Sequence, residues 1–307
     1  MVSVAVQAAP RGSGEWLDLA RTVEESGFDT LYAADHPGAT PAPFVTLAAA
    51  SAVTRTLRLG TYVVNAGVRE PHQIAVDAAT LDVVSGGRAV LGIGAGHTPA
   101  EWQAVGRDRP GVAGRVARCE AVALAVRDLL RGEEVTARGP HVSMTGRLTN
   151  PRPIQDPLPL LVGTSNSRLL RFAGEHADVV GLAGLGRTLP DGHQHEVRWT
   201  PEVVDEQVAL VEEGARAAGR DRPQLEALVQ LVAVTDDVDG ATAEVAEQTG
   251  IAADRLLEVP YVLAGTEDEI VGRIEQHHRR WGITRFVVRR DAVDVLAPLL
   301  PRLAAIG

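Results

Sequence analysis

The chain has 307 residues but a single cysteine, Cys119, and only 4% aromatic residues. One cysteine excludes a disulfide within the chain and a metal cluster held by cysteines alone. Cys119 lies in a predicted helix with Val116 and Ala123, where packing in the core is favoured over a nucleophilic role. No apolar run approaches the roughly 20 residues of a membrane-spanning helix, and the N-terminus lacks the charged start of a signal peptide. We therefore expect a cytoplasmic protein.

Positive charge is also scarce, because 30 basic residues face 40 acidic ones and the formal net charge is -10. No block of basic residues is present, so neither a nucleic acid nor an anionic membrane is expected as a partner. The motifs of α/β-hydrolases, zincins and P-loop enzymes are missing. No pair of histidines or carboxylates has metal-ligand spacing, so we predict no metal site. Chemistry without a protein nucleophile or a metal indicates an organic cofactor.

Short apolar runs alternate regularly with amphipathic helices along the chain. The runs typical of buried parallel strands are residues 2–7, 29–33, 57–64, 89–93, 160–163, 178–182, 225–234 and 285–288. The helices are predicted at residues 15–26, 44–53, 74–84, 115–130, 165–176, 201–218, 241–248, 252–258, 267–281 and 291–303. A small hairpin is expected over residues 135–148, and a lid or binding loop over residues 183–200.

Eight strands, each followed by a helix, predict a parallel α/β fold. The count favours a closed (β/α)8 TIM barrel with insertions over an open doubly wound sheet. No linker rich in serine, glycine or charge divides the chain, so we predict one domain over residues 1–307. In such barrels the reactive site lies at the carboxyl ends of the strands, which directs attention to the residues that follow each strand.

Asp35 and His36 follow the second predicted strand. A histidine at this position could hydrogen-bond a cofactor or exchange a proton near neutral pH. The alternative is that Asp35 caps the following turn and His36 lies in a surface loop before Pro37.

A glycine-rich turn from Gly92 to His97 follows the fourth strand. Its glycines allow a ligand to approach the backbone closely and leave N–H groups facing an anion. An ordinary tight turn between strand and helix explains the same residues. The glycine spacing and the place after the fourth strand do not fit a dinucleotide fingerprint.

Small polar residues from Gly163 to Arg168 follow the fifth strand and open a helix. Hydroxyls, exposed amides and an arginine at a helix N-terminus predict a phosphate cradle. The alternative is ordinary N-capping of the helix by Ser165 or Asn166.

Residues 69–96 carry a specific combination of short motifs, at residues 79–82, 85–88 and 92–96. This run resembles the hallmark of the bacterial luciferase-like superfamily, and the resemblance extends over nearly the whole chain. It implies a (β/α)8 barrel with a flavin or deazaflavin at its mouth. Asp35-His36 and residues 198–208 resemble the branch that uses the deazaflavin coenzyme F420.

The resemblance implies an F420-dependent oxidoreductase, most simply a reductase, that is commonly a homodimer. Hydride would pass between C5 of the deazaflavin and a small-molecule substrate with an activated C=C, C=N or C=O bond. Two alternatives stay open, an FMN-dependent two-component monooxygenase and a non-catalytic flavin-binding relative.

Individual positions also match the family pattern. Asp35 and His36 match the pair against the ring and substrate, with His36 as proton donor ahead of His97, His193 and His195. Tyr62-Val63 matches a dipeptide often joined by a cis bond, and Asn65 matches a contact to the ring edge. The remaining cofactor positions are Gly94, Ala95, Gly96 and His97 along the ribityl chain, Gly163, Thr164 and Ser165 at the phosphate, and Arg168, Arg171 and Arg187 near the anionic tail. The chain departs from the pattern at residues 98–100, where relatives often carry an asparagine.

Overall fold

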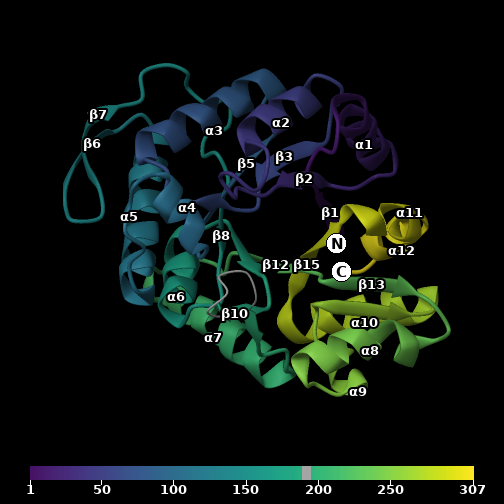
Figure 1. The fold of residues 1–307 in the computed structure, drawn as a ribbon. Coiled ribbons are helices and arrows are strands. Elements are labelled where there is room, and N and C mark those ends of the chain that lie inside the picture. Colours follow the sequence, from purple (N-terminus) through teal and green to yellow (C-terminus); the bar gives the residue numbers. More distant parts are fainter. Residues whose placement is uncertain (189–194) are drawn as a thin grey trace. The chain divides into compact units, whose positions relative to one another are not determined.

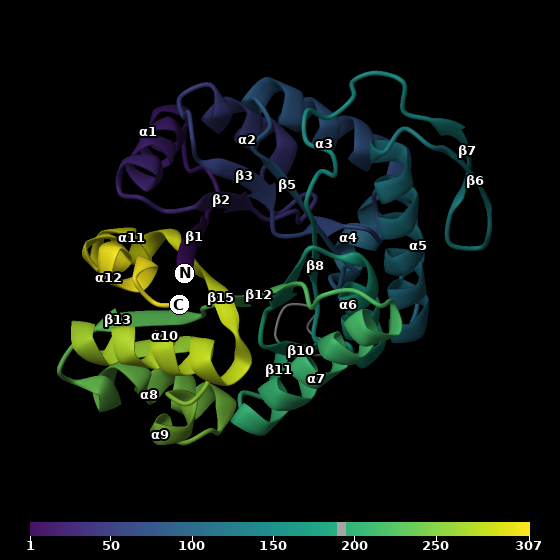
Figure 2. The same ribbon diagram turned by 180° about the vertical axis from the view of Figure 1, so that it is seen from behind.

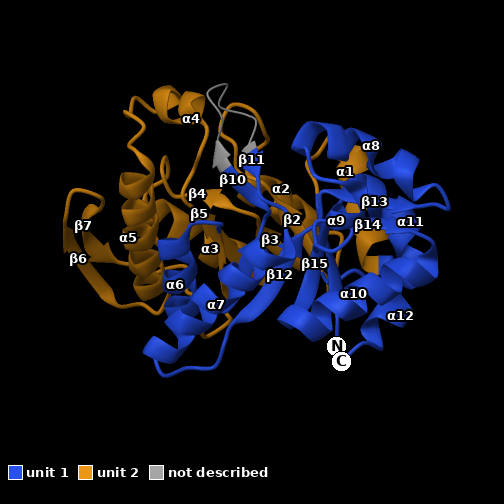
Figure 3. Ribbon diagram, turned by 90° about the horizontal axis from the view of Figure 1, so that it is seen from below, with its two compact units in different colours: residues 1–7, 25–29, 164–307 blue, residues 8–24, 30–163 orange. Residues whose placement is uncertain are grey.

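The computed structural model describes residues 1–188 and 195–307. Two compact units divide the chain (Figure 3): unit 1 comprises residues 1–7, 25–29 and 164–307, and unit 2 comprises residues 8–24 and 30–163. Each unit contains a run of four longer parallel strands of the main sheet, with helices between strands (Figures 1 and 2). None of the helices that the structure describes is long and apolar enough to cross a membrane.

In unit 2 the strands run parallel in the order β2 (Thr30–Ala33), β3 (Arg58–Thr61), β5 (Ala89–Gly94) and β8 (Leu160–Gly163). A short β4 (Val64–Asn65) pairs with the carboxyl end of β5. All six residues of β5 are buried, which explains its uninterrupted apolar sequence. The helices of this unit are α1 (Ser13–Glu25, except for its last residue), α2 (Pro43–Ser51), α3 (Pro71–Ser85), α4 (Pro99–Ala104) and α5 (Val112–Leu130).

Helix α3 shows why the local sequence folds as predicted. Pro71 occupies the first helical turn, where its missing N–H costs no hydrogen bond. Ile74, Ala78 and Leu81 are buried on one face. Gly86 ends the helix with φ of 73°, a left-handed conformation that glycine adopts without strain. The predicted hairpin is also confirmed, as β6 (Glu134–Arg138) and β7 (Ser143–Arg147) pair in antiparallel register.

In unit 1 the parallel order is β1 (Ser3–Gln7), β15 (Ile283–Arg289), β12 (Gln224–Leu228) and β9 (Val179–Leu182). Helices α6 (Ser167–His176) and α7 (Pro201–Ala217) pack closely against each other. A Cβ on Gly174 would collide with the carbonyl oxygen of Val211, so this helix contact requires a glycine. Helix α10 (Glu267–Trp281) begins with a capping box between Thr266 and Glu269.

The prediction of one strand over residues 225–234 is wrong. The chain leaves β12 after Leu228, and residues 231–234 form a separate strand, β13 (Leu231–Val234), which pairs in parallel with β14 (Val262–Gly265). Helices α8 (Val238–Thr249) and α9 (Ala253–Leu256) connect these two strands. An unbroken apolar run cannot show that its second half pairs with a different strand, because that choice depends on distant residues.

Two further predictions need correction. The closing helix over residues 291–303 is four short pieces, η1 (Arg290–Ala292), α11 (Val293–Leu296), η2 (Ala297–Leu299) and α12 (Leu300–Ala304). Pro298 and Pro301 break the regular helix because each lacks an N–H. The predicted loop at residues 183–200 contains two antiparallel strands, β10 (Leu185–Thr188) and β11 (His195–Val197).

Candidate active site

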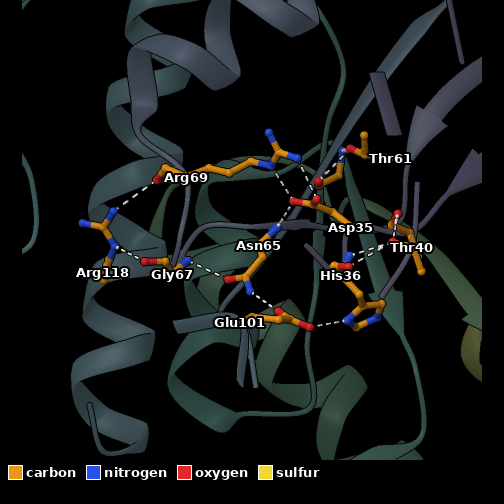
Figure 4. Close-up of polar contacts among 11 residues, drawn as sticks. Asp35, His36, Thr40, Thr61, Asn65, Gly67, Arg69, Glu101 and Arg118 are labelled. Atoms are coloured by element: carbon orange, nitrogen blue, oxygen red, sulfur yellow. Dashed lines mark hydrogen bonds and ion pairs between the residues drawn. The ribbon is translucent and has the colours of Figure 1, made fainter. Parts of the chain in front are cut away.

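Asp35, which follows β2, is the anchor of a polar network in unit 2 (Figure 4). Its side chain receives two hydrogen bonds from the Arg69 guanidinium, Nε to Oδ2 at 2.7 Å and Nη2 to Oδ1 at 2.8 Å. The backbone N–H of Asn65 also donates to Oδ2, at 3.0 Å. Asp35 is only 3% exposed, and its hydrogen bonds raise the pKa of Arg69. A carboxylate engaged by three N–H groups is better suited to holding strand ends together than to proton transfer.

His36 is held at both its backbone and its ring. Its backbone N–H donates to Thr40 Oγ1 at 3.0 Å, and its Nδ1 lies 2.7 Å from Oε1 of Glu101, a residue of α4. The Glu101 side chain is 4% exposed, whereas 38% of the His36 side chain is exposed. Burial alone would raise the pKa of Glu101, but hydrogen bonds with His36, Asn65 and Thr98 and the charge of His36 lower it below its ordinary value. His36 is therefore an accessible imidazole supported by a buried, ionised carboxylate.

The glycine turn contacts the same network. Gly96 has φ of 68°, and a Cβ there would collide with the side-chain amide of Asn65. The ring of His97, next in the chain, lies 5.6 Å from the ring of His36, centroid to centroid, at an interplanar angle of 76°. The turn thus lies against the network of His36 and Asn65, in addition to being a tight connection between strand and helix. Cofactor binding by the turn stays a prediction.

The peptide bond between Tyr62 and Val63 is cis, as predicted. Val63 lies against the strand ends on either side: a Cβ on Gly94 would collide with its Cγ2, and a Cβ on Gly163 would lie 2.9 Å from its Cγ1. Tyr62 is buried and its ring meets that of Tyr32 edge-on at 5.3 Å. The structure therefore brings together the predicted positions of unit 2, namely Asp35, His36, Val63, Asn65, Gly94, Gly96, His97 and Gly163.

Tyr62 and Ala95 also lie in unit 2, whereas the predicted phosphate and tail positions from Thr164 onward lie in unit 1. Asn166 caps α6, because its side-chain oxygen accepts from the N–H groups of Arg168 and Leu169 at 3.1 and 3.2 Å. Thr164 N donates to Gly181 O at 3.0 Å, and the Ser165 hydroxyl donates to Leu185 O at 2.5 Å. The N-cap alternative is confirmed for Asn166, while phosphate binding by Thr164 and Ser165 stays a prediction.

The arginines proposed for an anionic tail differ in their surroundings. Arg168 is exposed on the first turn of α6. Arg171 forms an ion pair with Glu213 of α7 at 2.9 Å, so its charge is already matched. Arg187 and His195 belong to β10 and β11, and His193 lies outside the described residues.

Cys119 is fully buried, and burial raises the pKa of its thiol to about 12. A thiol that stays protonated at neutral pH is a poor nucleophile, which confirms its predicted place in the core.

Two residues of the network, Arg69 and Glu101, were missed by sequence reasoning. Both lie far from their partners in the chain, because Arg69 is 34 positions from Asp35 and Glu101 is 65 positions from His36. One signal was available for Glu101, because Thr98 and Glu101 have the spacing of a capping box and so indicate the start of a helix.

Comparison with known proteins places this chain in a family. Residues 2–293 match the model of the luciferase-like monooxygenases. The chain belongs to the luciferase-like monooxygenase family.

This luciferase-like chain is 30% identical over 286 residues to the F420-dependent glucose-6-phosphate dehydrogenase of Nakamurella multipartita, covering 88% of the chain and 79% of that relative. It is 28% identical over 256 residues to the 5,10-methylenetetrahydromethanopterin reductase of Methanolobus tindarius, covering 83% and 69%.

Solved structures share the fold of the luciferase-like chain. A monooxygenase from Streptomyces bottropensis gives a TM-score of 0.78 at 24% identity, covering 99% of this chain and all (100%) of that one. The coenzyme F420 dependent tetrahydromethanopterin reductase from Methanopyrus kandleri gives 0.75 at 22% identity, covering 98% and 99%. The predicted fold class, an α/β (β/α)8 barrel, is confirmed.

Proposed function

We propose that this luciferase-like protein is an oxidoreductase that uses coenzyme F420 and transfers a hydride to or from a small-molecule substrate with an activated C=C, C=N or C=O bond. The observation that carries the proposal is the accessible His36 imidazole held by buried Glu101 beside the glycine turn. Relatives named for the same coenzyme support this cofactor. Their names cite glucose-6-phosphate and a methanopterin, so they indicate no single substrate.

The residues of unit 2 have the chemistry that a deazaflavin requires. Val63 packs between Gly94 and Gly163, and we expect a planar ring to rest against these small apolar groups. His36 and His97 provide two neighbouring imidazoles for the same proposed site. When bound, the deazaflavin supplies or accepts the hydride. We propose that Tyr62, Val63, Asn65, Gly94, Ala95, Gly96 and His97 hold the ring and ribityl chain.

His36 would exchange the proton that accompanies the hydride. An imidazole changes charge near neutral pH and so can both accept and donate a proton during turnover. Asp35 would hold His36 in position without exchanging a proton itself, because its contacts with Arg69 and Asn65 fix the strand end that carries His36.

A titration of the purified protein with F420 and, separately, with FMN tests the cofactor. We expect saturable fluorescence changes at micromolar F420 and none at the same concentrations of FMN. The reverse result would instead support a two-component monooxygenase. Tight F420 binding without turnover in a broad screen of alcohols, imines and enones would support a non-catalytic relative.

A second titration tests the predicted phosphate end. Ser165→Asp places a negative charge where an anionic group is expected, and like charges repel. We expect F420 affinity to fall by about tenfold or more. Ser143→Asp makes the same change on the exposed strand β7 and serves as the control, with unchanged affinity. Equal affinities in the two variants would remove Ser165 from the cofactor site.

We also propose that the protein forms a homodimer in the cytoplasm, as the family resemblance implies. Light scattering during size-exclusion chromatography should give twice the chain mass of 32.5 kDa. A monomeric mass at micromolar concentration would contradict this.

A further inference from the structure

Glu101 is a buried carboxylate that joins two other segments of unit 2 (Figure 4). Its Oε1 lies 2.7 Å from Nδ1 of His36, and its Oε2 accepts from Nδ2 of Asn65 at 2.5 Å. Each of the two oxygens therefore faces a separate nitrogen. Because the side chain is 4% exposed, water cannot readily replace either partner.

The position of Asn65 is determined independently of Glu101. Its Oδ1 accepts from the backbone N–H of Gly67 at 2.8 Å, and this contact directs the amide N–H group at Glu101. The backbone N–H of Asn65 donates to Asp35, which is itself bound to Arg69. A carboxylate pressed between a fixed amide and an imidazole has little freedom to turn.

This arrangement decides which nitrogen of His36 carries the proton. An ionised carboxylate can only accept hydrogen bonds, so the nitrogen next to it must donate. Nδ1 therefore bears hydrogen, and in the neutral ring the lone pair is on Nε2. Among the described residues, this ring contacts Glu101 of α4 and lies edge-on to His97 of the glycine turn, and the adjacent Asp35 is paired with Arg69.

We propose that Glu101 is a positioning residue for the proposed reaction, selecting the tautomer of His36 in which Nε2 exchanges the proton with the substrate. In the oxidising direction the substrate O–H bond would break and an Nε2–H bond would form, and a bound deazaflavin would accept the hydride from the substrate carbon. The reducing direction reverses each change. In this proposal Glu101 acts through the ring of His36, which it contacts at Nδ1. The inference rests on the function proposed above.

Glu101→Gln tests the proposal with little change of shape. The glutamine amide has an oxygen on one side and an NH2 group on the other, so its oxygen can face either His36 or Asn65 but not both. Nitrogen-15 NMR of the histidine rings, with His36 assigned from a His36→Gln sample, reads the tautomer without any cofactor. We expect wild type to hold the proton on Nδ1 and the variant to shift toward Nε2. Turnover should fall about tenfold or more, with F420 affinity within about threefold.

A double variant is expected to restore the hydrogen bonds between positions 36, 65 and 101. Glu101→Gln with Asn65→Asp exchanges the amide and the carboxylate, so the glutamine N–H can donate to the new carboxylate and its oxygen can accept from His36. The carboxylate at position 65 keeps an oxygen for the N–H of Gly67. We expect the Nδ1–H tautomer to return. The NMR signal is the readout for this variant, because Asn65 also belongs to the proposed cofactor site. Glu24→Gln is the control, because Glu24 accepts from the backbone N–H groups of residues 55–57, whereas Glu101 is the carboxylate that contacts His36 and Asn65.

The outcomes separate the two proposals. An unchanged tautomer in Glu101→Gln, whether or not turnover falls, overturns the positioning role. A shifted tautomer with full turnover overturns it as well. A shifted tautomer that the double variant reverses supports it, even if wild type fails to bind F420, in which case only the proposed cofactor is wrong.

Discussion

Two clusters of buried ion pairs, one in each unit, are built from similar residues but differ in what they can do. In unit 2, Asp35 and Glu101 lie past the strand ends and contact Arg69 and the exposed ring of His36. In unit 1, Arg285 of β15 contacts Glu226 of β12 at 2.9 Å and Asp29 at 2.8 Å. Arginine stays charged at every working pH, so the unit 1 cluster holds strands together, whereas the imidazole allows proton exchange in unit 2.

The histidines His277 and His36 show the same contrast. His277 of α10 is 3% exposed, stacks on Trp281 at 5.3 Å, and its Nε2 has no hydrogen-bond partner in the described part of the chain. Burial, and secondarily the charges of Arg273 and Arg280, lower its pKa to about 4. His36 is accessible and supported by a carboxylate. We therefore expect changes in unit 1 to act on stability and changes at His36 to act on turnover.

The largest expected effect is that of Arg285→Met. Glu226 is fully buried (0% exposed), and removing its partner leaves an uncompensated charge. The free energy of unfolding should fall by about 3–5 kcal/mol in urea titrations. The double variant Arg285→Met with Glu226→Leu removes the charge as well and should recover most of the loss. A loss below about 1 kcal/mol in the single variant would contradict the structural role.

The second largest expected effect is a pH dependence of the free energy of unfolding, caused by His277. Its folded pKa of about 4 lies below the ordinary value of 6.5, so the unfolded chain takes up the proton first. Neutral His277 makes its full contribution to the free energy of unfolding above pH 6.5. This contribution falls as the pH drops toward 4, by up to about 3 kcal/mol. His277→Phe should flatten unfolding free energy over this window and leave turnover unchanged. The same slope in both proteins would mean that other groups cause it.

His36→Ala should lower turnover by about tenfold or more, through loss of the proton donor. Because the buried Glu101 carboxylate loses His36 but keeps Asn65, the free energy of unfolding should also fall, by about 1–3 kcal/mol and less than in Arg285→Met. Steady-state kinetics and urea titration of one preparation check both expectations. Unchanged turnover at the same F420 affinity would remove His36 from the mechanism and end the contrast with His277.

The smallest effect concerns Glu24. Burial opposes its ionisation, but the backbone N–H groups of Thr56, Leu57 and Arg55 outweigh burial and lower its pKa to about 2. Ionised Glu24 therefore contributes to the free energy of unfolding above pH 4.5, and this contribution is lost as the pH falls through 2. Glu24→Gln should lower the free energy of unfolding by about 1 kcal/mol at neutral pH, because a neutral oxygen accepts these hydrogen bonds less well. In thermal unfolding, the difference in midpoint temperature between Glu24→Gln and wild type should be smaller at pH 3 than at pH 7.

The sequence by itself determined the elements whose signals are local. Strand and helix periodicity located all eight barrel strands, the hairpin at 135–148 and the glycine turn, and the family resemblance located the cis bond at Tyr62-Val63. These features depend on residues within a few positions of one another.

The tertiary structure alone decided which side chains meet. It paired Asp35 with Arg69 and His36 with Glu101, and it moved residues 231–234 from β12 to a separate sheet with β14. A charged residue on a short helix or loop has the same local signal whether it faces solvent or a partner 65 positions away. The partner is chosen by how the strand ends converge, because burial makes an unpaired charge too costly to keep.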